Sequence, residues 1–191
     1  MEATLKDWLG SVWKVMIFPF PRTFINEAQK AKGKTASAIV ALLLLTIIVN
    51  LFNYVVLDHV FSPITILAAL ILAPIQTFFL AFWLDTICRK LFHFNTSYYD
   101  EYLYLAVVVA IVTQTLYTIL NLIPFLQGNY LLAAWYLYPI LLLTIAVQSL
   151  TKVKIWQATV IVVLSTIFAL IGFACVAIFL LMMTRGMPGI Y

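Results

Sequence analysis

Charged side chains are scarce in this sequence. Only 9% of its 191 residues are Asp, Glu, Lys or Arg, and 65% are hydrophobic. A soluble domain has about 25% charged and roughly 45–50% apolar residues. A chain of this length cannot hide so much apolar surface from water, so the composition predicts an integral membrane protein. The net charge of +4 does not indicate nucleic-acid binding, because the basic residues lie in short segments between apolar runs.

Histidine and cysteine, which supply most metal ligands and many catalytic groups, are nearly absent. His59 and His93 are expected on opposite sides of the membrane, so they do not share one site. Cys88 falls near the inner surface and Cys175 in the outer half of the last apolar run, so no disulfide is expected and no metal-ligand spacing is present. His-Glu-x-x-His and Gly-x-Ser-x-Gly patterns are also absent. The sequence therefore predicts a non-enzymatic protein without a cofactor or metal.

Long apolar runs are what the sequence has in abundance. There are five, covering residues 36–57, 64–84, 101–124, 131–150 and 156–183. Each has at least about the 20 residues that a helix needs to cross a bilayer. We therefore predict an all-α, polytopic membrane protein with five transmembrane helices.

The basic residues predict the direction of these crossings. Of the eleven Lys and Arg residues, six precede the first run, two follow the second, two follow the fourth and one follows the fifth. Five crossings place ten of the eleven on one side, because loops with and without basic residues then alternate between the two sides. Four or six crossings would break this alternation. The positive-inside rule then makes the N-terminus cytoplasmic and the C-terminus external. We expect a cytoplasmic segment (1–34), a transmembrane domain (35–184) and an outer tail (185–191), in a bacterial or archaeal cytoplasmic membrane, or in the ER or Golgi of a eukaryote.

The N-terminal segment has the pattern of an amphipathic helix that lies in the membrane interface. Its apolar residues follow helical spacing from Leu5 to Met16 and include Trp8 and Trp13. The other side of this helix carries Lys6, Asp7, Ser11 and Lys14. Three lysines, Lys30, Lys32 and Lys34, stand directly before the first crossing, where they attract anionic headgroups. The alternative is that the apolar side packs on the protein's own bundle.

Two further helix starts have sequence signals. Thr23 is a plausible N-cap for a short helix over residues 24–32, after Pro19 and Pro21 have ended the first helix. Ser97 and Asp100 have the spacing of a capping box and predict the start of the third crossing.

Two polar stripes fall within the apolar runs, at similar depth in the outer half of the bilayer. The first is Thr46, Asn50 and Asn53, and the second is Gln114, Thr118 and Asn121. They predict either hydrogen bonds between helices or a polar cavity for a solute or lipid headgroup. An ion or proton pathway is not expected, because no ionisable group lies at mid-depth.

Small residues recur every four positions in the second crossing, at Ala69, Ala73, Thr77 and Ala81. Such a seam lets another helix approach closely, either within the bundle or in a homo-oligomer. At the inner end of the same run, Asp85 and Arg89 are four residues apart and are expected to form an ion pair.

Two segments resemble the Yip family of Ypt/Rab-GTPase-interacting membrane proteins. Phe18-Pro-Phe-Pro21-Arg-Thr-Phe24 is similar to the Pro-x-x-Thr-Phe segment that precedes the first crossing in that family. Residues 135–144, followed by Lys154-Ile-Trp-Gln-Ala158, resemble its late region. No segment matches the Asp-Leu-Tyr-Gly-Pro type motif of eukaryotic members, so the resemblance is to the short prokaryotic ones and does not imply GTPase binding. It does imply five crossings and a cytoplasmic N-terminus.

Two hypotheses for function follow. The first is a Yip-like, non-enzymatic protein that organises membrane or partner proteins through its cytoplasmic face, in contact with anionic lipid. The second is a small channel or transporter subunit, oligomeric, that uses the polar residues at positions 50, 53, 114 and 121. Under either hypothesis, the protein's partner would be another membrane protein or a second copy of the chain.

Overall fold

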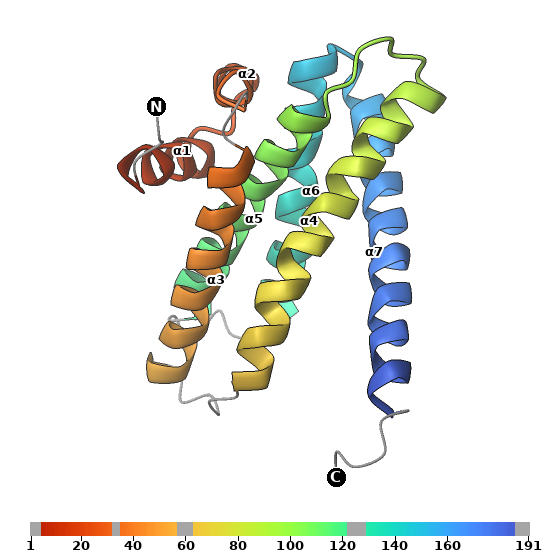
Figure 1. Cartoon of the computed structure of the whole chain (residues 1–191). Coiled ribbons are helices and arrows are strands. Elements are labelled where there is room, and N and C mark those ends of the chain that lie inside the picture. Colours follow the sequence, from red (N-terminus) through yellow and green to blue (C-terminus); the bar gives the residue numbers. More distant parts are fainter. Residues whose placement is uncertain (1–4, 32–34, 57–62, 122–128, 186–191) are drawn as a thin grey trace.

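The computed structural model describes residues 5–31, 35–56, 63–121 and 129–185. These residues form seven α-helices and no β-strand (Figure 1), which confirms the all-α prediction. The helices are α1 (Leu5–Ile17), α2 (Pro21–Ala28), α3 (Thr35–Val56), α4 (Pro63–Leu91), α5 (Tyr99–Asn121), α6 (Asn129–Thr151) and α7 (Ile155–Arg185). Lys32 and Lys34 lie outside the described residues.

Three of these helices are long and apolar enough to cross a membrane. The stretches are Ala69–Leu91 in α4, Tyr99–Leu120 in α5 and Ile155–Val176 in α7. Among the described residues, α3 and α6 contribute the shorter apolar stretches Ala36–Phe52 and Leu137–Thr151. These helices support a membrane-embedded protein, while five crossings and their direction stay predictions.

The long helices pack around a common axis. Helices α4, α5, α6 and α7 each contact the next, and α7 returns to α4, so the four form a closed four-helix ring. Helix α3 packs against α4 and α5 from outside this ring. Helix α1 lies across the bundle, where it contacts α5, and α2 sits beside it against α6 (Figure 1).

Helix α5 is the centre of the molecule. Every residue from 102 to 109 is buried, because α1, α2, α3, α4 and α6 all pack on this helix. The other long helices expose large apolar side chains, among them Ile48 on α3, Phe82 on α4 and Ile171 on α7. An apolar exterior around a packed interior suits a lipid solvent, in which these side chains need no protein cover.

The helix starts differ from two of the expectations. Helix α2 begins at Pro21 rather than after Thr23, with Phe20 as its N-cap. Proline fits the first helical position, because its missing N–H would be unpaired there in any case. Helix α5 begins at Tyr99, and Ser97 does not pair with Asp100 in the expected capping box. Its hydroxyl donates instead to Asp85 Oδ1 at 3.1 Å, across the α4–α5 turn.

Asp85 holds this turn from the end of α4. Besides Ser97, its Oδ1 accepts the backbone N–H of Tyr98 at 2.9 Å, and its Oδ2 pairs with Arg89 at 2.7 Å. The predicted ion pair is therefore confirmed. A carboxylate from one helix thus satisfies a backbone donor at the start of the next. The absence of a disulfide is also as expected, since Cys88 and Cys175 are both free.

Candidate functional site

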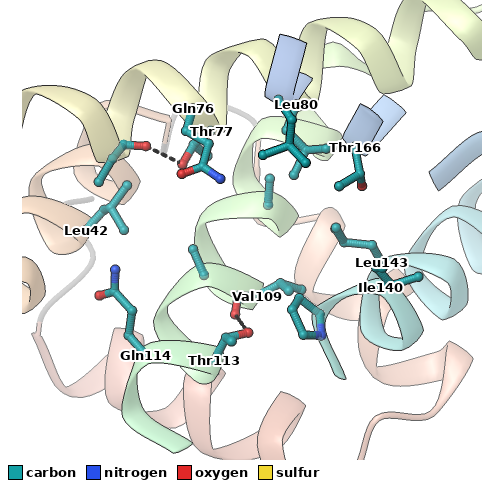
Figure 2. A pocket seen from close by; sticks show the side chains of 15 residues that line it. Leu42, Gln76, Thr77, Leu80, Val109, Thr113, Gln114, Ile140, Leu143 and Thr166 are labelled. Carbon is teal, nitrogen blue, oxygen red and sulfur yellow. Dashed lines mark hydrogen bonds between the residues drawn. The ribbon is translucent and has the colours of Figure 1, made fainter. Parts of the chain in front are cut away.

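A cavity of about 230 Å³ lies inside the four-helix ring (Figure 2). Residues of α4, α5, α6 and α7 line it, and Leu42 of α3 reaches it from outside the ring. The lining residues fall near the middle of each long helix, such as Thr77 of α4, Pro139 of α6 and Thr166 of α7. In a bilayer this position corresponds to the hydrocarbon interior.

Small side chains leave this space open. Ala73 and Thr77 on α4 and Ala106 and Ala110 on α5 all belong to its lining. Pro139 contributes the α6 wall, and it has no N–H with which to continue the helical hydrogen-bond ladder. The predicted seam thus faces the inside of the bundle at Ala73, Thr77 and Ala81, while Ala69 is half-buried. Ala81, one turn beyond Thr77 and next to Leu80 of the lining, is fully buried.

The hydroxyl groups around the cavity donate to their own helices. Thr77 Oγ1 donates to the carbonyl of Ala73 at 2.8 Å, Thr113 to that of Val109 at 2.7 Å, and Thr166 to that of Val162 at 2.8 Å. Each hydroxyl hydrogen is therefore committed, while each hydroxyl oxygen keeps acceptor capacity. Such back-bonding is the usual way in which threonine is accommodated in an apolar helix.

Gln114 contributes a buried polar atom without a hydrogen-bond partner to this wall. Its side chain extends from α5 toward Leu42 and the α4 residues (Figure 2). Its Oε1 is buried and has no hydrogen-bond partner. Buried acceptors in proteins are nearly always paired, so this oxygen marks a place where a donor is missing.

The predicted polar stripes come together only in part. Gln114 lines the cavity, whereas Asn50 and Thr118 do not. The Asn50 amide donates to the Thr46 carbonyl at 2.7 Å, and the Thr118 hydroxyl donates to the Gln114 carbonyl at 2.9 Å. These hydrogen bonds stay within one helix instead of joining two. The side chains of Asn53 and Asn121 lie outside the described residues.

Sequence reasoning missed the remaining polar residues of the cavity, which are Gln76, Thr113 and Thr166. Thr113 precedes Gln114 directly, and this polar pair in an apolar run was the available signal. Thr166 stands in a run without a polar stripe, so its position in the wall depends on how α7 is rotated. The sequence carries no sign of that rotation.

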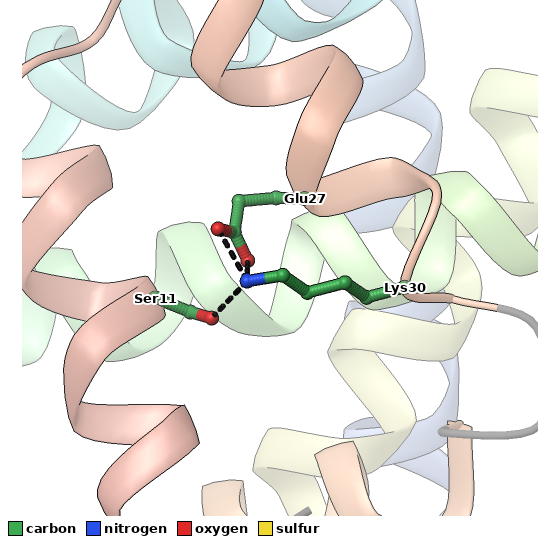
Figure 3. A network of polar contacts seen from close by, with 3 residues as sticks. All are labelled: Ser11, Glu27 and Lys30. Carbon is green, nitrogen blue, oxygen red and sulfur yellow. Dashed lines mark hydrogen bonds and ion pairs between the residues drawn. The ribbon is translucent and has the colours of Figure 1, made fainter.

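A second polar group joins α1 and α2 to the bundle (Figure 3). The ammonium of Lys30 donates to both carboxylate oxygens of Glu27, at 2.7 and 2.8 Å, and to Ser11 Oγ at 3.2 Å. The hydroxyl of Tyr104 on α5 also hydrogen-bonds Ser11 and Glu27. An ionised carboxylate only accepts, so tyrosine donates to Glu27. The four side chains thereby form a closed cluster between α1, α2 and α5.

This cluster changes the expected roles of two residues. Ser11 belongs to the predicted polar side of α1, and it is buried because its hydroxyl hydrogen-bonds Lys30 and Tyr104, whereas Lys14 of the same side is exposed. Lys30, one of the three lysines predicted at the interface, is 36% exposed and pairs through its ammonium with Glu27. Trp8 lies in α1, and its side chain is outside the described residues.

The outer side of α1 and the link to α2 are apolar and exposed. Trp13 is 60% exposed, Phe18 54% and Phe20 62%. The basic residues Lys14 and Arg22 are exposed next to them in the sequence. We call these five residues the interfacial patch. Exposed aromatic rings accompanied by cations are the composition of surfaces that contact lipid headgroups.

No group of three or more His, Cys, Asp or Glu side chains is placed to hold a metal ion in the part of the chain that the structure describes. Comparison with protein-family models, with curated proteins and with solved structures gives no match to this chain.

Proposed function

We propose that this chain is a Yip-like, non-enzymatic membrane protein that organises lipid or partner proteins at the cytoplasmic surface. The interfacial patch is the observation that carries the proposal, because three exposed aromatic side chains are costly in water and favourable in a headgroup layer. In this arrangement α3, α4, α5, α6 and α7 make five crossings, with the N-terminus inside. The host membrane is a bacterial or archaeal cytoplasmic membrane, or the ER or Golgi in a eukaryote.

The distribution of charge supports this orientation. The α4–α5 and α6–α7 turns lie at the same end of the bundle as α2, and α7 ends at the other (Figure 1). The exposed cations Lys90, Lys152 and Lys154 belong to these two turns. Together with Lys14 and Arg22 they give this end the positive character of a cytoplasmic surface.

Fixed contacts hold the patch in place. The Ser11–Glu27–Lys30–Tyr104 cluster attaches α1 and α2 to α5. The Tyr138 hydroxyl of α6 donates to the Met16 carbonyl at the end of α1, at 3.3 Å. Because the bundle fixes the geometry of this surface, its binding to a lipid layer or a partner does not require further ordering of α1 and α2 and costs less conformational entropy.

Photo-crosslinking in intact native membranes tests this function. A photoreactive residue in place of Phe20 should capture anionic phospholipid and a recurrent protein neighbour. The matched control is the same residue in place of Ile48, which is equally exposed but on α3. Identical products from both positions would contradict the proposal. A GTPase or coat-like neighbour would favour a trafficking role, although the proposal does not include GTPase binding.

The cavity favours a second candidate function, that of a small channel or transporter subunit. The polar residues in its otherwise apolar wall, near the middle of the four helices, are where a solute would be held on its way across. Proteoliposomes that contain the full chain should then pass small neutral solutes faster than empty liposomes. Equal rates in the two kinds of liposome would contradict this second function and would leave the first proposal unaffected.

A further inference from the structure

We propose that the cavity inside the four-helix ring is a binding site for a small neutral molecule with one or more hydroxyl groups, such as a polyol or the hydroxyl-bearing end of a neutral lipid. This goes beyond a role at the membrane surface. It also names the ligand class for the second candidate function, but binding does not require that the ligand be transported.

The hydrogen-bond chemistry of the wall suits a ligand that carries hydroxyl groups. Thr77, Thr113 and Thr166 donate their hydroxyl hydrogens to backbone carbonyls, so each presents an oxygen to the cavity. Gln76 and Gln114 each add an amide, with one carbonyl oxygen and one NH2 group, and Gln114 Oε1 has no partner. A hydroxyl group both donates and accepts, so it can supply the missing donor to Gln114 Oε1 and also pair with an amide NH2.

Because the wall carries no charge, the ligand that fits it is neutral. None of the lining residues is ionisable. In the hydrocarbon interior a cation or an anion would lack a counter-charge in this wall. A neutral polyol avoids this penalty. Its carbon skeleton can also contact Leu42, Leu80 and Leu143, which belong to the apolar part of the wall.

The volume limits the ligand's size. A cavity of 230 Å³ lies below the roughly 300–1,000 Å³ of sites for drug-sized molecules. It would hold about eight waters at the ~30 Å³ that each occupies in the liquid. Glycerol and the hydroxyl-bearing end of a diacylglycerol are both small enough for this volume. Glycerol brings three hydroxyl groups and a diacylglycerol brings one.

The test uses the purified full chain in micelles and saturation-transfer NMR, which detects weak binding of small molecules. Glycerol is the first probe, and 1,2,3-trimethoxypropane, with the same skeleton but no donor, is its control. Dioleoylglycerol, followed by native mass spectrometry, is the lipid probe. We expect glycerol or dioleoylglycerol to bind, and trimethoxypropane to give a signal at least fivefold weaker than glycerol where glycerol binds.

Matched variants assign the signal to the cavity. Gln114→Leu removes the unpartnered oxygen and should lower the signal at least fivefold, as should Ala110→Leu, which fills the space. Thr118→Val, one turn further along α5 and outside the lining, should leave it unchanged. Should Gln114→Leu fail to fold, Thr113→Val combined with Thr166→Val makes the same test.

The outcomes separate the alternatives. Binding of glycerol identifies a free polyol as a source, and binding of dioleoylglycerol alone identifies a lipid. The proposal is overturned if neither binds, if trimethoxypropane binds as well as glycerol, or if Gln114→Leu and Thr118→Val behave alike. Binding without flux in proteoliposomes would support the site and count only against the transport function.

Discussion

The carboxylate of Glu27 is 2% exposed, and its two oxygens lie 2.7 and 2.8 Å from the Lys30 ammonium. A charge so far removed from water is stable only when it is paired and hydrogen-bonded. Lys30, Ser11 and Tyr104 together provide these partners. At the scale of single residues, the position of α1 and α2 therefore depends on this one carboxylate remaining satisfied.

Lys30→Met should destabilise the docking of α1 and α2 more than Glu27→Gln. Removing one partner of a buried pair typically costs about 3–5 kcal/mol, and partial exposure of Lys30 brings the expected loss to about 2 kcal/mol. Glutamine keeps an oxygen for Tyr104, and the charge that remains is that of Lys30, whose side chain is 36% exposed. Hydrogen exchange of the α1 and α2 amides in the full chain measures the difference.

The double variant Glu27→Gln with Lys30→Met serves as the control for this comparison. It removes both charges, so it should be more stable than Lys30→Met alone. Equal protection of the α1 and α2 amides in the double and single variants would show that the buried charge is not what holds these helices.

At the scale of elements, α4 and α7 have the most extensive contact in the bundle. Trp83 of α4 stacks on Phe168 of α7, with ring centroids 4.7 Å apart. One turn further along α7, Gly172 lets the Phe79 ring approach, since a Cβ at this position would lie 3.2 Å from two ring carbons. Close approach of two helices at a glycine is a common way of packing in membranes.

Gly172→Leu should separate α4 from α7. Overpacking of a tight contact typically costs about 1–3 kcal/mol, and we expect a loss of about 2 kcal/mol. Thermal unfolding in detergent, followed by size-exclusion chromatography, measures it. Gly10 in α1 is the matched glycine, because a Cβ there meets nothing within 4 Å. Gly10→Ala should stabilise α1 by about 0.5–1 kcal/mol, and a loss at both sites would contradict this account.

At the scale of the whole molecule, the question is how the bundle sits in the membrane. Three helices have the length and composition to cross it. Helices α3 and α6, of 22 and 23 residues, run alongside them (Figure 1). A helix of this length extends about 33 Å at 1.5 Å per residue, enough for the ~30 Å hydrocarbon core.

We predict that the two ends of the chain lie on opposite sides of the membrane. A reporter fused to the N-terminus should be active only in the cytosol, and the same reporter fused after residue 191 only outside. The expectation comes from the ten basic residues that five crossings place on one side. If both reporters were active on the same side, the number of crossings would be even, and this would contradict the proposed orientation of α1 and α2.

The sequence by itself determined the class of the molecule and its local features. The free energies of transferring apolar side chains into lipid are close to additive along the chain, so the long apolar runs can be identified without knowing the tertiary structure. The Asp85–Arg89 pair was equally readable, because residues four apart in a helix are always neighbours. Neither prediction depended on contacts between residues that are far apart in the sequence.

Only the tertiary structure decided which polar side chains meet. Ser11, Glu27 and Tyr104 come from three helices, and Gln114 joins Thr166 in the cavity wall whereas Asn50 does not. A transmembrane helix that is apolar all round has no side that the sequence marks as inward. Its rotation is fixed by close packing and by a few hydrogen bonds, and these exist only once the neighbouring helices are in place.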